Sequence, residues 1–207
     1  LDPNTVDDLY LGCGLPGGES GNNMGRIVNI LNGMDEVPGA TLTRYCASSV
    51  QTTRMAFHAI KAGEGDVFVS AGVEAVSRYA RGNSDGLPPE AQALVGGGWQ
   101  NPVFGEARRR SEERAAGGAP DWTDPRETGD VPDIYLAMGH TAENLAQAYG
   151  VSREDMDDFG VRSQNLAEKA IADGFWAREI TPVTLPDGSV VSTDDGPRAG
   201  VTLEAVA

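Results

Sequence analysis

The first 85 residues alternate between short runs that fit strands and longer runs that fit helices. The strand-like runs are apolar or alternate β-branched with polar residues, while the helical runs repeat apolar positions with a period near 3.6. The expected elements are strands within 7–16, 39–46 and 66–71 and helices at 24–31 and 47–62. Strands that alternate with helices predict an α/β fold with a mixed, mostly parallel sheet covered by helices.

The periodic pattern stops between residues 81 and 133. Proline, glycine and charged residues dominate this stretch, which we interpret as an insertion or loop region. It is not expected to be a disordered tail, because Trp99, Phe104 and Trp122 need a surface to pack on. A long loop region in a compact protein is more often functional than idle.

Helical periodicity returns in the last third of the chain. Residues 138–149 predict a helix that Thr141 would cap and Gly150 would end. A longer helix is expected to begin after Ser152, to carry an apolar stripe and to end at Gly174. The stripe contains Met156, Phe159, Ser163, Leu166, Ala167 and Ala170. A hairpin is then expected around the turn sequence PDG.

The charge balance narrows the possible partners. The chain of 207 residues carries 31 acidic and 16 basic residues, a formal net charge of -15. Nucleic acid or an anionic membrane surface would need a concentration of Lys and Arg, so neither is expected as a partner. Long apolar runs of membrane-spanning type are missing from the sequence, and two histidines among scattered carboxylates indicate no metal site.

The cysteines and the chain ends bear on the location of the protein and on its length. Two cysteines in a chain of this length make no disulfide framework, and together with the lack of a visible signal peptide they predict a cytoplasmic location. The chain starts without Met and ends on the apolar phrase GVTLEAVA. We therefore expect it to be part of a longer protein.

One cysteine stands where a strand pattern turns into a helix pattern. In TRYCASSV, Cys46 would be the first helical residue, where unpaired backbone N–H groups and the helix dipole favour negative charge. Such a setting favours the nucleophilic thiolate, and the small neighbours Ala47, Ser48 and Ser49 leave room for a substrate. Placement alone also fits a buried packing residue, so both interpretations stay open. Cys13, inside an apolar strand, is expected to be structural.

Neither histidine is a convincing base for Cys46. If residues 46–60 form one helix, His58 lies roughly 18 Å from Cys46 at 1.5 Å per residue, too far to reach its sulfur. His58 is expected on the helix surface or in a groove. His140 precedes the next helix at the end of the loop region, where it could touch substrate. The sequence thus offers a candidate nucleophile without a partner for proton transfer.

Three segments together resemble the thiolase family. The cysteine segment TRYCASSVQTTRMAFHAIKAGEGDVFVSAGVEAVSR is similar to the family signature around its acyl-carrying cysteine. Eight residues match in order: Arg44, Cys46, Ala47, Ser48, Gly63, Gly72, Glu74 and Ser77. The block that begins AMGHTAEN, residues 137–183, resembles a second family stretch, and residues 6–26 resemble the strand and loop before the cysteine.

The resemblance implies an acyltransferase of fatty acid metabolism and β-oxidation. Cys46 would take an acyl group from acyl-CoA for Claisen condensation with acetyl-CoA. In the degradative direction, it would cleave a 3-ketoacyl-CoA and pass the acyl group to free CoA, the reaction called thiolytic cleavage. Coenzyme A or acyl-CoA would be a substrate, with no permanently bound cofactor and no metal. Met138 matches the family Met that lines the acyl and CoA pocket. The implied assembly is a homodimer or homotetramer.

The resemblance also implies a divided fold of which only part is present. Residues 1–85 would be a partial N-terminal α/β domain with the nucleophile corner, and residues 86–207 would be part of a loop domain covering the acyl-CoA site. In the family, a histidine and a second cysteine of the C-terminal half act as base and acid. Their motifs are absent here, so the 207-residue chain alone is expected to be inactive.

Some residues depart from the family pattern. Ala137 stands where the family often has a polar residue, and it would make the pocket less polar. No family role transfers to His140. The cluster from Arg108 to Arg114 could meet CoA phosphates or form a solvated charged face. Two other functions stay open: a non-catalytic thiolase-like protein that binds acyl-CoA or assembles with a partner, and a ketoacyl synthase, which lacks the second block.

Overall fold

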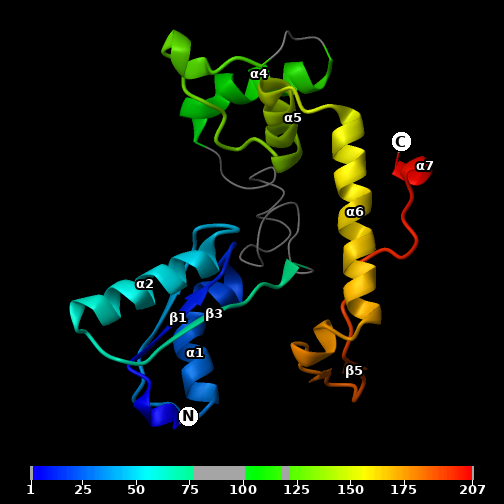
Figure 1. The fold of residues 1–207 in the computed structure, drawn as a ribbon. Helices are drawn as coiled ribbons and strands as arrows, with labels where there is room; N and C mark the ends of the chain where they lie inside the picture. Colours follow the sequence, from blue (N-terminus) through cyan, green and yellow to red (C-terminus); the bar gives the residue numbers. More distant parts are fainter. Residues whose placement is uncertain (1, 77–100, 118–121, 207) are drawn as a thin grey trace. The chain divides into compact units, whose positions relative to one another are not determined.

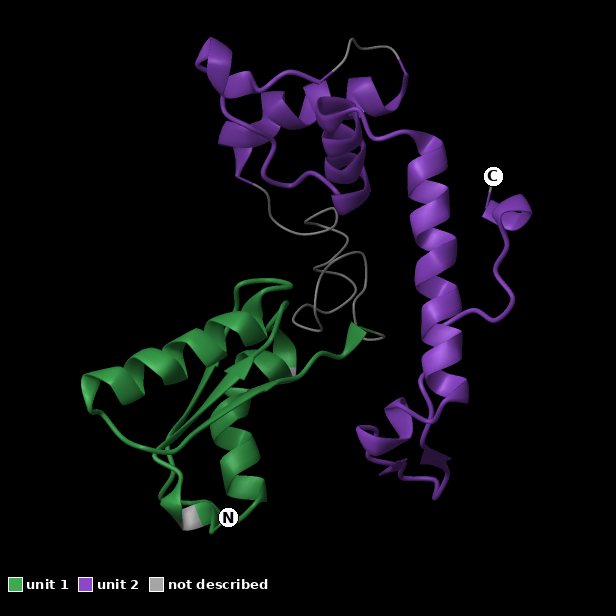
Figure 2. Ribbon diagram, viewed as in Figure 1, with its two compact units in different colours: residues 1–100 green, residues 101–207 purple. Residues whose placement is uncertain are grey.

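The computed structural model describes residues 2–76, 101–117 and 122–206. The chain forms two compact units, unit 1 from Leu1 to Gln100 and unit 2 from Asn101 to Ala207, shown in green and purple in Figure 2. The predicted domain boundary between residues 85 and 86, together with Ser77 and Trp99, lies outside the described residues.

Unit 1 has the predicted order of strands and helices (Figure 1). Its elements are η1 Pro3–Thr5, β1 Asp8–Gly12, η2 Gly18–Gly21, α1 Met24–Leu31, β2 Gly39–Leu42, α2 Ser48–Ala62 and β3 Phe68–Gly72. The three strands form one parallel sheet in the order β2-β1-β3. Gly63 ends α2 in the left-handed conformation with φ 77°, as its position predicts.

The central strand β1 lies in the core of unit 1. Successive side chains of a strand point to opposite faces, and Leu9, Tyr10 and Leu11 are all buried, so both faces of β1 are covered. Parallel connections are right-handed in nearly all proteins, which places α1 and α2 on opposite faces of a sheet with this strand order. Among the described residues, every buried hydrophobic side chain except Ala107 belongs to unit 1.

Unit 2 consists mainly of helices. Its elements are η4 Pro102–Phe104, α4 Gly105–Ala115, η5 Pro125–Thr128, α5 Met138–Tyr149, α6 Arg153–Ala172, η6 Trp176–Arg178, β4 Val183–Thr184, β5 Val190–Val191 and α7 Leu203–Val206. The interpretation of residues 81–133 as loop is wrong at α4, which is helical because Arg and Glu side chains pair along it at helical spacing. The predicted hairpin is confirmed by the antiparallel pairing of β4 and β5.

The longest helix, α6, begins as predicted. Ser152 Oγ accepts a hydrogen bond from the Asp155 N–H at 3.0 Å, and the Asp155 carboxylate accepts one from the Ser152 N–H at 3.4 Å. The predicted stripe is not buried within unit 2: Phe159 is 68% and Leu166 51% exposed, while Met156, Ala167 and Ala170 are half-buried. Thr141 does not cap α5, because that helix begins earlier, with Ala137 as its N-cap.

Candidate active site

The carboxyl ends of the three parallel strands meet at one edge of the sheet. β1 ends at Gly12 and β3 at Gly72, which are partners in the register, while the chain leaves β2 toward Cys46. A cavity of about 300 Å³ lies at this edge. It is lined by the last residues of β1 and β3 and by residues that come after each of the three strands: Gly12, Gly14, Tyr45, Cys46, Ser48, Ser49, Gly72, Val73 and Glu74. Ligands of open parallel sheets bind beyond the carboxyl ends of the strands. This cavity is therefore the candidate active site.

Cys46 lies in a tight turn between β2 and α2. The helix begins at Ser48 with Ala47 as its N-cap, so the prediction that Cys46 is the first helical residue is wrong. The turn intervenes because Tyr45 adopts a left-handed backbone with φ 48°. The N–H of Ala47 then donates to the Arg44 carbonyl at 3.1 Å, and the N–H of Ser48 donates to the Tyr45 carbonyl at 3.0 Å.

A buried serine holds this turn in place. Non-glycine residues rarely adopt the left-handed conformation of Tyr45, which costs on the order of 1–3 kcal/mol and persists where neighbouring groups enforce it. The Ser48 hydroxyl accepts a hydrogen bond from the Arg44 N–H at 2.8 Å and donates one to the Tyr45 carbonyl at 2.6 Å. Ser48 thus fixes the strained backbone that precedes Cys46.

Two glycines allow the start of α2 to approach the sheet closely. A Cβ atom at Gly12 would lie 2.9 Å from backbone atoms of Ser48 and Ser49, and one at Gly72 would lie 2.3 Å from Ser49 Oγ. The first turn of α2 contains no acidic residue and receives no side-chain cap. Its N–H groups and dipole therefore favour an anion in the cavity, such as a thiolate or the oxyanion formed from a thioester.

The two cysteines have opposite environments. Cys46 is exposed, which removes the packing interpretation for it within unit 1, while Cys13 is only 2% exposed. Burial raises the pKa of the Cys13 thiol, and the nearby negative charge of Glu74 raises it further. A thiol held protonated in this way is a poor nucleophile, which agrees with a structural role for Cys13.

Glu74 is a cavity residue for which the sequence alone indicated no role. Its Oε2 accepts a hydrogen bond from the Gly14 N–H at 2.6 Å, and its Oε1 accepts the Cys13 S–H at 3.5 Å. A Cβ atom at Gly14 would lie 2.7 Å from Oε2, so a side chain at this position would displace the Glu74 carboxylate. The available signals were the match of Glu74 to the family pattern and its position two residues after β3, the third parallel strand.

The two histidines belong to different units, His58 to unit 1 and His140 to unit 2. His58 is exposed on α2, where its ring meets Phe57 edge-on at 5.4 Å between centroids. His140 does not precede a helix as predicted. It lies in the first turn of α5, because that helix already begins at Met138. Within unit 1, His58 is not among the residues that line the cavity around Cys46.

Met138 belongs to unit 2, at the start of α5. Its side chain is 74% exposed, and its carbonyl accepts a hydrogen bond from the Thr141 hydroxyl at 2.7 Å. The Thr141 hydroxyl also lies 3.8 Å from the Met138 sulfur. Within unit 2, Met138 therefore presents an uncovered thioether that a ligand or another part of the protein could contact.

The arginine cluster on α4 pairs mainly with carboxylates. Arg108 bonds Glu112 at 2.8 Å, while Arg109 binds both Glu106 and Glu113. The Arg109 guanidinium lowers the pKa of the Glu106 carboxyl through its hydrogen bond and charge. These pairs favour the solvated charged face over a phosphate site, because the positive charges are already neutralised.

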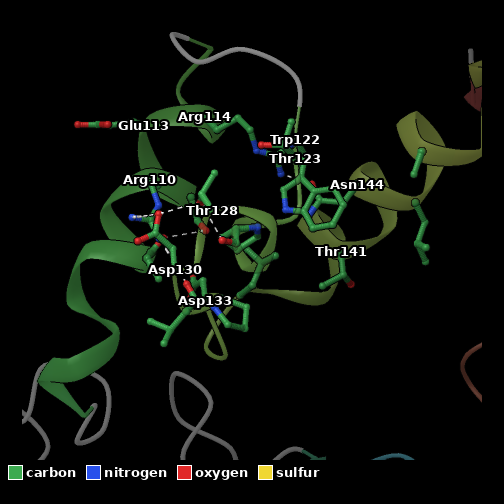
Figure 3. Close-up of a pocket in the computed structure, with 18 residues that line it drawn as sticks. Arg110, Glu113, Arg114, Trp122, Thr123, Thr128, Asp130, Asp133, Thr141 and Asn144 are labelled. Carbon is green, nitrogen blue, oxygen red and sulfur yellow. Dashed lines mark hydrogen bonds and ion pairs between the residues drawn. The ribbon is translucent and has the colours of Figure 1, made fainter.

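Unit 2 contains a second and larger cavity, of about 740 Å³ (Figure 3). It lies among α4, η5 and α5 and is lined by Arg110 and Arg114 but also by Glu113, Asp130 and Asp133. Arg110 lies 3.7 Å from the Asp130 carboxylate, and Arg114 donates to the buried amide of Asn144. Because carboxylates outnumber arginines in its lining, this cavity offers no excess positive charge for phosphates.

Residues 2–76, 101–117 and 122–206 contain no group of three or more His, Cys, Asp or Glu side chains arranged to hold a metal ion. None of the helices in the same ranges combines the length and apolarity needed to cross a bilayer.

Comparisons with known proteins agree on one family. The model of the thiolase N-terminal domain matches residues 1–207. The β-ketoadipyl-CoA thiolase of Acinetobacter baylyi is 36% identical over 209 residues, covering 98% of this chain and 47% of the relative. The 3-ketoacyl-CoA thiolase of Bacillus subtilis is 35% identical over 181 residues, covering 87% and 37%. The chain thus spans about half the length of these relatives or less.

Solved structures show the same relationship. The acetyl-CoA acetyltransferase of Bacillus anthracis matches with a TM-score of 0.68 and 28% identity, covering 99% of this chain and 46% of that one. The dimeric peroxisomal thiolase of Saccharomyces cerevisiae matches with a TM-score of 0.70 and 26% identity, covering 99% and 44%. With the α/β architecture and a cysteine corner at the carboxyl edge of its sheet, the chain belongs to the thiolase family, of which it carries the N-terminal domain.

Proposed function

We propose that the full-length protein is an acyl-CoA thiolase in which Cys46 carries the acyl group as a thioester. The observation that carries this proposal is the exposed cysteine in a strained turn, at the cavity where three parallel strands end. The names of the relatives support the class of substrate, since they include β-ketoadipyl-CoA and 3-ketoacyl-CoA thiolases.

In the degradative direction, the Cys46 thiolate attacks the 3-keto carbonyl of the substrate. A carbon–sulfur bond forms, and the bond between C2 and C3 breaks, so that C2 leaves as a carbanion equivalent and takes up a proton to give acetyl-CoA. The thiol of free CoA, after loss of its proton, then attacks the acyl-cysteine and releases acyl-CoA and the Cys46 thiolate. The N–H groups at the start of α2 suit the oxyanions formed in these steps.

Two further parts of this proposal concern unit 2. Met138 contacts the acyl or pantetheine part of the substrate, a role supported by its uncovered side chain at the start of α5. Residues 86–207 contribute to a loop domain that covers the acyl-CoA site. Proton transfer depends on residues outside the 207-residue chain, so this chain alone is expected to give negligible turnover.

The assembly and location are also proposals. The yeast structure is described as dimeric, which supports a homodimer or a dimer of dimers for this protein. A cytoplasmic location stays a prediction. Permanent cofactors have no place in the proposed reaction, in which CoA enters as a substrate.

Steady-state thiolysis by the full-length protein tests the proposal. With acetoacetyl-CoA or a longer 3-ketoacyl-CoA and free CoA, Cys46→Ser is expected to lower kcat by at least about 10³-fold, because it removes the nucleophile. His58→Gln, an exposed change on α2, the helix that follows Cys46, is the matched control and is expected to keep wild-type turnover. Binding of acyl-CoA without any turnover by the wild type would favour the non-catalytic alternative.

A further inference from the structure

Three loops around the cavity of Cys46 are joined by a continuous set of hydrogen bonds. The Glu74 carboxylate, after β3, accepts the Gly14 N–H at 2.6 Å, after β1. The Gly14 carbonyl accepts the Thr43 hydroxyl at 2.8 Å, after β2. The same Thr43 oxygen accepts the Tyr45 N–H at 3.3 Å. The contacts therefore run from Glu74 to the residue directly before Cys46.

The last residue of this set is the strained one. Tyr45 has a left-handed backbone with φ 48°, a conformation that needs support from its surroundings in a non-glycine residue. Thr43 holds the Tyr45 N–H from one side, while Ser48 holds the Tyr45 carbonyl. If Thr43 is released, the turn can relax toward a common conformation and move the Cys46 sulfur away from the start of α2.

Glu74 acts on this turn from a distance. Each of its carboxylate oxygens accepts hydrogen bonds from the loop after β1, with Gly14 on Oε2 and Cys13 and Leu15 on Oε1. Oxygens engaged in this way anchor a loop and are poorly placed to exchange protons with a substrate. The anchored loop in turn presents the Gly14 carbonyl to Thr43.

We propose that Glu74 and Thr43 are positioning residues that hold the strained turn before Cys46 in its reactive geometry. This inference rests on the proposed role of Cys46 as the acyl carrier. It assigns to Glu74 the anchoring of the β1 loop, and to Thr43 the direct contact with the turn. Neither residue touches the reacting atoms, so their effect is expected in the rate of acyl transfer and only weakly in substrate affinity.

Single-turnover acylation by acetyl-CoA, in the full-length protein, measures both quantities. Thr43→Val keeps the shape of the side chain but loses the hydroxyl, and Glu74→Gln replaces one acceptor oxygen by a donor. Each is expected to lower the maximal acylation rate about tenfold to 100-fold, because a small misplacement of a reacting group has effects of this size. The half-saturating concentration of acetyl-CoA is expected to change less than about threefold, since binding contacts are kept.

Two variants serve as controls. Thr43→Ser restores the hydroxyl and is expected to recover acylation to within about threefold of the wild type, which loss of packing alone would not explain. Glu36→Gln removes an exposed carboxylate outside the cavity and is expected to behave as the wild type. Thermal unfolding verifies that each variant is folded. If Glu74→Gln does not fold, the comparison of Thr43→Val with Thr43→Ser decides.

Alkylation of Cys46 by iodoacetamide separates failure of this inference from failure of the proposed function. Should the wild type take no acyl group on Cys46, the proposed function is wrong, but alkylation still reports the geometry of the sulfur. Slower alkylation in Thr43→Val that Thr43→Ser restores supports positioning. Folded Thr43→Val and Glu74→Gln proteins with wild-type acylation and alkylation rates would overturn it.

Discussion

Unit 1 and unit 2 differ in how far their side chains are buried. Unit 1 buries both faces of its central strand, whereas α6 of unit 2 has no buried residue and exposes Phe159 and Leu166. The cavity of Cys46 belongs to the unit with the packed sheet, where neighbouring strand ends can fix a strained turn. A reactive group in a turn that is held by the ends of packed strands keeps its geometry better than one on a loosely held segment. Within unit 2, by contrast, the helices expose large apolar side chains, and exposed apolar surface of this kind often marks an interaction site.

Truncation of a leucine in each unit gives the largest expected contrast. Leu11 is 3% exposed in β1, so Leu11→Ala is expected to destabilise unit 1 by about 2 to 5 kcal/mol. Leu166→Ala on α6 is expected to cost less than about 1 kcal/mol, since half of this side chain is already in solvent. Hydrogen exchange in β1 and α6 peptides of the 207-residue chain measures each effect locally. Equal costs at both sites would break the comparison.

Glycine substitutions test the same contrast, because stability is expected to fall in unit 1 and to rise in unit 2. Gly12→Ala places a Cβ against the backbone of Ser48 and Ser49 and is expected to cost about 1 to 3 kcal/mol. Gly160, inside α6, has open space around the Cβ position, so Gly160→Ala is expected to stabilise the helix by up to about 1 kcal/mol. Urea denaturation compares the two variants, and a stabilising Gly12→Ala would contradict the close packing of α2 on the sheet.

Loss of the capping box of α6 is expected to have an intermediate effect. Ser152→Ala removes the acceptor for the Asp155 N–H and should destabilise the start of α6 by about 1 kcal/mol. Exchange of the first-turn amides should become faster while β1 peptides stay unchanged. Ser152→Thr, which keeps a hydroxyl, is the control. Faster exchange in β1 as well would mean that the two units are energetically linked.

The smallest expected effect concerns acid stability of unit 1. Asp7 accepts hydrogen bonds from the N–H groups of Val67 and Asp66, which lower the pKa of its carboxyl below the ordinary 3.8. A lowered folded-state pKa gives stability that is present above pH 3.8 and is lost as the pH falls through the folded value. Asp7→Asn should therefore have a lower urea midpoint than the wild type at pH 6, and the difference between the two midpoints should be smaller at pH 3. The same difference at both pH values would contradict this.

Local patterns account for much of what the sequence predicted. The order of strands and helices in unit 1, the end of α2 at Gly63 and the capping by Ser152 follow from apolar periodicity and terminal residues. Helix α4 was missed because its helical pattern lies in Arg–Glu pairs and not in apolar positions. The pattern around TRYC placed a cysteine at a strand-to-helix corner but could not show the turn at Tyr45.

Contacts across long sequence separations could not be predicted from local patterns. Glu74 lies 60 residues from Gly14, and their contact depends on the register that sets β3 beside β1. The Thr43 contact with Gly14 likewise depends on β2 pairing with the other edge of β1. The sequence therefore predicted Cys46 as the candidate nucleophile and gave Glu74 only as a residue of the family pattern, without the contacts that link Glu74 and Thr43 to the turn before Cys46.

Peptide mapping after exposure to acetyl-CoA tests the central claim most directly. The full-length protein is mixed with acetyl-CoA, quenched in acid and digested, and the peptides of Cys46 and Cys13 are compared within the same sample. The account predicts an acetyl group on Cys46, none on the buried Cys13, and its removal when free CoA is added before quenching. An unmodified Cys46, or an acetyl group found on Cys13 instead, would contradict it.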